Sequence, residues 1–173
     1  MSTWTFEGRK DSQLVTSDWN PTNQVQIAGV RTQLIGNVLG DRGYLTEVYR
    51  RDWHLDDAEV DQVFQKVMAP GDLSAWHAHK NTVDRLFCAY GRVKVVLFDG
   101  REGSSTYGQV AQYRLGTERP ALIVIPPGVW HGVQATGTGP SILINIVDKA
   151  YSYQDPDHWR MPADCPEIPY RFT

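Results

Sequence analysis

The chain has 173 residues and a formal net charge of −3, with 17 lysine and arginine residues against 20 aspartate and glutamate residues. This length suits one domain with a sizeable core, and the charge balance excludes a broad basic surface for nucleic acid. Two cysteines are too few for a disulfide framework, no apolar run approaches the roughly twenty residues that span a bilayer, and no charged-then-apolar leader opens the chain. A cytoplasmic protein without a membrane partner is predicted.

From about residue 25 the chain divides into short apolar or β-branched runs separated by glycine, proline and asparagine, without a sustained helical period. In chain order the predicted strands are 25–34, 44–50, 63–68, 73–79, 84–90, 93–98, 109–115, 121–125, 130–135 and 142–147. The glycine-containing turns at 90–92 and 137–140 fit hairpin connections. Many short strands need closure or stacking, so an all-β barrel or double-sheet jelly roll is predicted.

The predicted organisation is a single domain over residues 1–173. Residues 1–24 are interpreted as an N-terminal arm that packs on the barrel or on a second subunit, and the sequence leaves this choice open. Residues 25–147 form the barrel, and the proline-punctuated residues 148–173 form a short C-terminal tail that wraps its outside.

Three of the five histidines lie in two short motifs. His77 and His79 point to the same face of an extended strand, because alternate residues of a strand share a face. His131 follows a proline-rich corner at the start of another strand. These positions predict a pocket wall that carries titratable side chains. His54 and His158 have no such neighbours and are interpreted as surface residues.

A set of residues resembles the two sequence motifs of the cupins, which are small β-barrels: Gly71, His77, His79, Asp84 and Gly91 for the first, and Pro126, Gly128 and His131 for the second. One hypothesis is therefore a metal-dependent cupin enzyme, an oxygenase or isomerase, whose ligands are His77, His79, Asp84 and His131. Imidazole and carboxylate suit iron, manganese, nickel or zinc. Against this hypothesis, Asp84 is one methylene shorter than the usual glutamate.

A second resemblance covers more of the chain, from about residue 38 to residue 131. Gln65, His77 and the segments DRGYLTE (41–47), DGREGSSTYG (99–108) and IPPGVWHG (125–132) are similar, in order, to the dTDP-4-dehydrorhamnose 3,5-epimerase family. This resemblance implies a cupin-like jelly roll, usually dimeric, that moves protons on a dTDP-linked 4-keto-6-deoxy sugar without a cofactor. The expected partners are a small nucleotide-sugar substrate and a second copy of the chain.

The same resemblance implies catalytic roles for four residues. His77 takes the place of the base, and a neutral imidazole can remove a proton next to a ketone near neutral pH. His79 is expected to be a proton shuttle or a partner of the base. Arg85 falls within about a residue of the family's lysine and is expected to stabilise the enolate oxygen. Asp164 lies one residue out of register with the aspartate that orients the base.

Four further residues are implied as substrate contacts. Arg42 and Glu47 match family contacts to the nucleotide part, with Arg42 binding the diphosphate through charge-assisted hydrogen bonds. Gln65 matches a substrate-binding position in the family's order. His131 is expected to form a pocket wall or a hydrogen bond to the ligand.

One departure from the family concerns its general-acid tyrosine, whose position holds Ile144 or, with a gap, Asn145. Double epimerisation is therefore in doubt, and a mono-epimerase remains open. A 3,4-ketoisomerase also remains open, because residues 76–80 resemble that group, which moves protons on one face of the sugar. A non-catalytic cupin that binds a sugar or nucleotide is the third hypothesis. The sequence does not specify the sugar or the reacting carbon.

Overall fold

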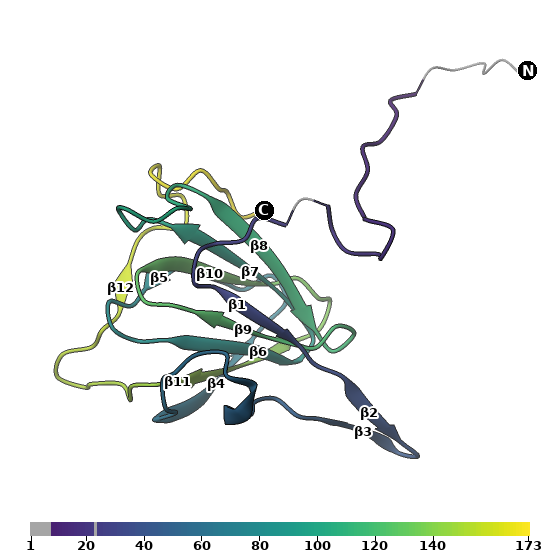
Figure 1. The fold of residues 1–173 in the computed structure, drawn as a ribbon, viewed down its shortest axis with the longest axis horizontal. Coiled ribbons are helices and arrows are strands. Elements are labelled where there is room, and N and C mark those ends of the chain that lie inside the picture. The colour runs from purple at the N-terminus through teal and green to yellow at the C-terminus, as the bar shows by residue number, and fades with distance from the viewer. Residues whose placement is uncertain (1–7, 23) are drawn as a thin grey trace, which may run out of the picture.

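A computed structural model describes residues 8–22 and 24–173, which form two facing antiparallel sheets and a separate hairpin (Figure 1). The strand order is β1-β9-β6-β11-β4 in the first sheet and β12-β5-β10-β7-β8 in the second. This order of non-consecutive neighbours is that of a jelly roll and confirms the predicted all-β fold class. The strands are β1 (Arg31–Leu34), β2 (Asn37–Gly40), β3 (Gly43–Thr46), β4 (Gln62–Met68), β5 (Leu73–Ala78), β6 (Asp84–Tyr90), β7 (Arg92–Asp99), β8 (Val110–Gly116), β9 (Ala121–Ile125), β10 (Val129–Ala135), β11 (Ser141–Val147) and β12 (Trp159–Arg160).

The structure differs from the predicted strands mainly near the ends of the chain. The first strand begins at Arg31, after a turn at Gly29, whose φ of 81° lies in the left-handed region that favours glycine. The segment predicted at 44–50 belongs to the β2–β3 hairpin and ends at Thr46. β12 was not predicted, because two residues are too few to show an alternating pattern.

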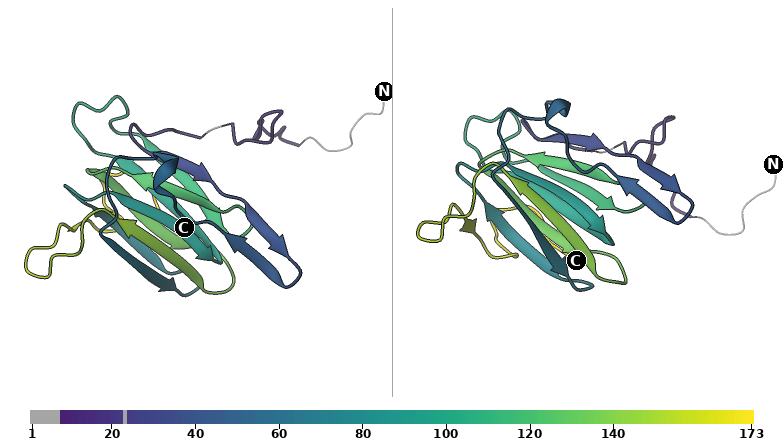
Figure 2. Two further views of the ribbon diagram at one scale, coloured as in Figure 1. Left: turned by 60° about the horizontal axis from the view of Figure 1, so that its bottom comes forward. Right: turned by 90° about the horizontal axis from the view of Figure 1, so that it is seen from below.

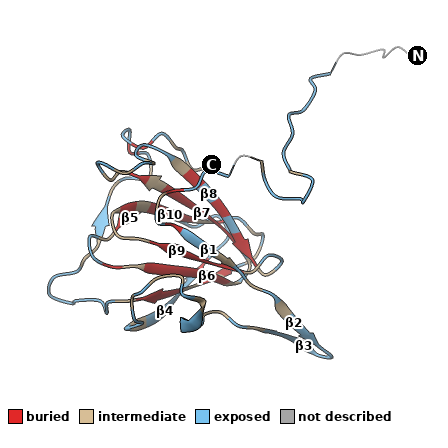
Figure 3. Ribbon diagram, in the orientation of Figure 1, coloured by how far each residue is buried: buried red, intermediate tan, exposed pale blue. Residues whose placement is uncertain are grey.

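The strands of the two facing sheets are buried over much of their length (Figure 3), and a cluster of apolar residues fills most of the space between them. Alternate residues of the inner strands point into it, including Leu86, Val95, Leu97, Ile123, Ile125 and Leu143. The same alternation carries polar residues onto these inner faces: Asp84 lies two residues before Leu86, and Asn145 two residues after Leu143. Both polar side chains are buried. The sheet pattern therefore creates a polar region continuous with an apolar core.

The C-terminal tail packs on the outer face of the second sheet. Trp76 and Val96 from that sheet form a buried cluster with Cys165 and Ile168 from the tail. The rings of Trp76 and Phe172 lie with centroids 5.0 Å apart. This packing leaves the opposite, inward face of β5 for His77.

Two segments extend from the paired sheets (Figure 2). The described part of the N-terminal arm contains one isolated antiparallel β-bridge, between Val15 and Pro21. The Trp19 side chain in this arm is exposed to solvent. The β2–β3 hairpin projects beyond the sheets and exposes Leu39 and Leu45.

Within the described residues, no helix combines the length and the apolar character needed to cross a membrane.

Candidate active site

Four histidines gather at one place on the inner side of the second sheet. His77 on β5 and His131 on β10 are cross-strand partners, and their ring centroids are 4.1 Å apart. His79 follows β5, with its ring 5.8 Å from that of His131. His158 precedes β12, and its ring lies 5.3 Å from that of His77 and 5.1 Å from that of His79. The structure thus brings together the three histidines predicted from sequence and a fourth.

Asp84, the first residue of β6, faces these histidines from the first sheet. Its Oδ2 lies 3.3 Å from Nε2 of His79 and 3.4 Å from Nε2 of His131. Its Oδ1 accepts a hydrogen bond of 2.6 Å from Nδ2 of Asn145. Asp84 and His131 are each 2% exposed, so these interactions operate with little competing water. The result is a polar network that links the two sheets.

Backbone carbonyl groups orient two of the imidazole rings. Nδ1 of His131 lies 3.1 Å from the carbonyl oxygen of Val129, and Nδ1 of His79 contacts the carbonyl oxygen of Asp157. A carbonyl oxygen can only accept a hydrogen bond, so each Nδ1 carries the hydrogen. In the neutral rings, both Nε2 atoms therefore present lone pairs toward the carboxylate of Asp84.

The other two histidines have free ring nitrogens. Nδ1 of His77 and Nε2 of His158 are buried and, among the described residues, have no hydrogen-bond partner. Both residues are nevertheless partly accessible as a whole. A buried polar atom without a partner is costly, so these two nitrogens are available to a ligand.

Burial favours the neutral form of the His77 and His131 imidazoles. It lowers the pKa of His77 well below the usual 6.5, and the neighbouring imidazoles and the Arg160 guanidinium lower it further. Burial also lowers the pKa of His131, partly opposed by the negative charge of Asp84. A neutral imidazole at physiological pH is the form that a general base requires.

Three of the four residues proposed as cupin metal ligands converge. The ligand atoms of His79, Asp84 and His131 lie within 4.8 Å of one another, and His77 is outside this group. The aspartate side chain is thus long enough to reach both imidazoles despite being shorter than glutamate. Two imidazoles and one carboxylate suit a divalent transition metal, so these three residues fit such an ion.

Arg85 does not join the histidines. Consecutive residues of a strand face opposite sides, and Arg85 points away from the inner face that holds Asp84. Its fully buried guanidinium donates to the carboxylate of Asp56, with Nε to Oδ2 at 2.8 Å, and to the carbonyl oxygen of Ala58 at 2.8 Å. The residue predicted to stabilise the enolate oxygen therefore lies on the opposite side of the first sheet from His77.

The remaining predicted site residues are exposed: Arg42 in the turn of the β2–β3 hairpin, Glu47 after β3, Gln65 on β4 and Asp164 in the tail. Glu47 forms an ion pair of 3.2 Å with Arg50. In the described part of the chain, no hydrogen bond or ion pair joins any of the four to the histidines.

The tyrosine position of the family can also be located. Asn145 points inward to Asp84, and Ile144 points to the other face of the first sheet, where it pairs with Gln65 of β4. Of the two residues aligned with the general acid, the inward one therefore carries an amide.

Sequence reasoning missed His158 and Arg160. Both reach one face of the short extended segment at β12, and Arg160 is the cross-strand partner of His77. The alternation of His158, Trp159 and Arg160 was the only signal, and it is too short to predict a strand.

Asp157 anchors this segment beside the site. Its carboxylate accepts hydrogen bonds from the backbone N–H groups of Lys80 at 2.8 Å and Asn81 at 2.7 Å, and from the hydroxyl of Thr82 at 3.2 Å. The ammonium of Lys80 lies 3.9 Å from the ring centroid of Trp159. These contacts fix β12 against the end of β5.

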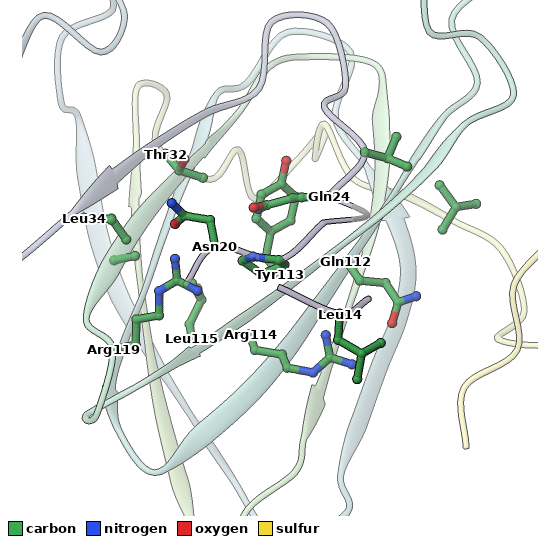
Figure 4. A pocket seen from close by; sticks show the side chains of 14 residues that line it. Leu14, Asn20, Gln24, Thr32, Leu34, Gln112, Tyr113, Arg114, Leu115 and Arg119 are labelled. Carbon is green, nitrogen blue, oxygen red and sulfur yellow. The ribbon is translucent and has the colours of Figure 1, made fainter. Parts of the chain in front are cut away.

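A cavity of about 540 Å³ lies elsewhere, between the arm and the sheet edges formed by β1 and β8 (Figure 4). Its lining includes Asn20, Gln24, Tyr113 and Arg119. β8 and β5 lie on opposite sides of β10 and β7 in the second sheet, so this cavity is separate from the histidines.

Comparison with known proteins relates most of the chain to one family. Residues 24–168 match the sequence model of dTDP-4-dehydrorhamnose 3,5-epimerase. A probable low-salt glycan biosynthesis epimerase from Haloferax volcanii is 38% identical over 124 residues, which cover 71% of this chain and 80% of that protein. A spore coat polysaccharide biosynthesis protein from Bacillus subtilis is 33% identical over 147 residues, which cover 85% of this chain and 97% of that protein.

A solved structure agrees with these sequence matches. The dTDP sugar isomerase from Desulfovibrio desulfuricans has a TM-score of 0.78 and 29% identity, covering 83% of this chain and 90% of that one.

Proposed function

Because this chain belongs to the dTDP-4-dehydrorhamnose 3,5-epimerase family, we propose that it is an enzyme that isomerises a dTDP-linked 4-keto-6-deoxy sugar. The proposed reaction removes a proton from a carbon beside the ketone and returns a proton after an enolate has formed. The observation that supports it best is His77, a neutral and partly accessible imidazole in a cluster of polar side chains.

In the proposed mechanism His77 is the base. Its low pKa keeps the ring unprotonated, and no hydrogen bond to a described residue occupies its Nδ1. His131 forms the adjacent wall; the carbonyl oxygen of Val129 holds its Nδ1, and its Nε2 lies 3.4 Å from Oδ2 of Asp84. His79 lies within the same network, with its Nε2 3.3 Å from Oδ2 of Asp84. General acid–base catalysis of this kind contributes about 10²- to 10⁴-fold to a rate.

Solvent-deuterium exchange tests the proposal. Incubation of the enzyme with dTDP-4-keto-6-deoxyglucose in deuterium oxide should introduce deuterium at a carbon beside the ketone, detected by proton NMR. A non-catalytic binding protein would bind the nucleotide sugar without this exchange, and that outcome would refute the proposed activity.

Within the family, we favour proton transfer on one face of the sugar. The inward residue at the tyrosine position is Asn145, and an amide is not a general acid near neutral pH. A mono-epimerase and a 3,4-ketoisomerase both fit this site. Exchange at both carbons next to the ketone, with inversion at both, would contradict this assignment, whereas one exchanged carbon is expected.

We also propose that the protein is a homodimer. The β2–β3 hairpin projects from the sheets and exposes Val38, Leu39 and Leu45 at 68%, 80% and 72% (Figure 1). Val38 and Leu45 are cross-strand partners on one face of the hairpin, and Leu39 lies on its other face. Both faces therefore expose apolar side chains, as is typical of an interface. Arg42 lies in the turn of this hairpin, so its predicted contact with diphosphate is assigned to the assembled protein. Light scattering should give twice the chain mass, and Leu39→Lys with Leu45→Lys should give the monomer mass.

A metal-dependent cupin enzyme is the second candidate, favoured by the convergence of His79, Asp84 and His131. A bound divalent ion would polarise a carbonyl oxygen of the substrate. Elemental analysis of the purified protein separates the two candidates. A stoichiometric transition metal that is lost in His79→Ala would favour the metal enzyme.

A cytoplasmic location is part of the proposal. Cys88 and Cys165 are both buried free thiols, which suits a reducing compartment.

A further inference from the structure

Proton removal beside a ketone needs a positive group or hydrogen-bond donor at the ketone oxygen, because that oxygen becomes negative as the enolate forms. Arg85 was the expected group, but it lies across the first sheet and is bound to Asp56. The site around His77 therefore needs another source of positive charge.

The strand register places Arg160 beside His77. β12 pairs with β5 so that Arg160 is directly opposite His77, and β10 pairs with β5 so that His131 is opposite His77 on its other side. Directly opposed residues of antiparallel strands share a face, with Cβ atoms about 5 Å apart. Arg160, His77 and His131 thus form a row across one face of the second sheet.

The guanidinium of Arg160 is free to bind a ligand. Among the described residues, no carboxylate forms an ion pair with it and no hydrogen bond holds it. The side chain is exposed, so a substrate can reach it.

The backbone that carries Arg160 is fixed in place. Asp157 binds the turn at residues 80–82, and Trp159 packs beneath the ammonium of Lys80. Trp76 and Met161, which neighbour His77 and Arg160 in the chain, are joined by two backbone hydrogen bonds of 2.9 and 3.0 Å. These contacts set the backbone position from which the guanidinium reaches the site before the substrate binds.

We propose that Arg160 is the catalytic cation that stabilises the enolate oxygen formed when His77 removes the proton. In this step the C–H bond breaks, its electron pair forms the carbon–carbon double bond of the enolate, and the proton moves to His77. The carbonyl π pair moves to oxygen, which accepts hydrogen bonds from the guanidinium. Return of a proton to carbon restores the ketone, so no oxidant or reductant is needed. This inference rests on the proposed function.

Steady-state kinetics of Arg160→Ala and Arg160→Lys test the role. Loss of one oxyanion donor lowers kcat by about 10²- to 10³-fold, and that fall is expected for Arg160→Ala with KM nearly unchanged. Arg160→Lys keeps the charge but loses the planar donor pair, so partial activity is expected. Added guanidinium ion should restore part of the kcat of Arg160→Ala.

The matched control is Arg114→Ala, which removes an exposed arginine from β8 of the same sheet and should leave kcat unchanged. Circular dichroism and thermal melting verify that each variant is folded. An unchanged kcat in Arg160→Ala would overturn the inference. A raised KM with an unchanged kcat would also overturn it, because Arg160 would then serve substrate binding only. Absence of exchange in the unmodified enzyme would instead refute the proposed function.

Discussion

Asp84 and Arg85 are adjacent in sequence but act on opposite faces of the first sheet. Asp84 contacts the histidines between the sheets, and Arg85 forms a buried ion pair with Asp56 on the other face. The alternation of β6 therefore separates a residue of the candidate site from a residue that supports the fold.

Arg85→Met should lower stability and leave the chemistry intact. Removing one partner of a buried ion pair leaves the Asp56 carboxylate uncompensated, which costs about 3–5 kcal/mol of unfolding free energy. Denaturant unfolding measures this loss, and exchange activity per folded molecule should stay within about twofold.

Arg92→Met is the control for Arg85→Met, because the Arg92–Glu118 pair is exposed and exposed pairs contribute little to stability. Equal stability losses in the two variants, or a lost kcat in folded Arg85→Met, would contradict the structural role of Arg85.

Asp157→Ala should loosen the segment that carries His158 and Arg160. The variant removes the acceptor of three hydrogen bonds from residues 80–82, of which the bond from the buried Thr82 is the costliest to lose. Hydrogen exchange should rise in residues 157–161 and the isomerisation rate should fall. Asp155→Ala, an exposed change two residues earlier, should do neither; equal effects of both variants would argue against an anchor at Asp157.

His158→Asn should slow the reaction at least about tenfold. The expected fall is set against the contribution of about 10²- to 10⁴-fold that an acid–base group makes to a rate. The buried Nε2 of His158 has no partner among the described residues and lies in the ring cluster with His77. The same substitution at His54, which is exposed, should leave the rate unchanged. A normal rate in His158→Asn would limit this residue to packing.

Acid should weaken both folding and catalysis through His77. The pKa of this ring is depressed in the folded protein, so the unfolded chain binds the proton more readily as pH falls below the ordinary value of about 6.5. Stability is therefore highest above pH 6.5 and declines as pH falls toward the folded-state pKa. Since the base stays neutral at pH 6.5, the acid limb of kcat/KM should lie below that pH. An acid limb at or above pH 6.5 in a pH–rate profile would contradict the buried, neutral base.

The alternating apolar runs were sufficient to predict an all-β jelly roll, because burial of one strand face leaves a period of two in the sequence. β2, the first strand of the β2–β3 hairpin, and β12 escaped prediction for a physical reason. The hairpin exposes its apolar side chains, and β12 is held by contacts of Asp157 and Lys80 with distant residues.

The candidate site could be predicted only in part. His77 and His131 were found because their motifs lie on core strands. His158 and Arg160 depend on a tail that returns to β5, which no local pattern encodes. For Arg85, alignment to a family position suggested a role beside the ketone. Because residues of β6 alternate between the two faces of the first sheet, the Arg85 side chain lies on the face away from the histidines.

The exchange rate of His77→Asn in deuterium oxide tests the central claim most directly, since asparagine keeps a polar side chain but cannot act as the base. Compared with the unmodified enzyme, the rate of deuterium entry beside the ketone should fall by about 10²-fold or more, with thermal stability and nucleotide binding retained. A folded His77→Asn protein that exchanges deuterium at the unmodified rate would contradict the account.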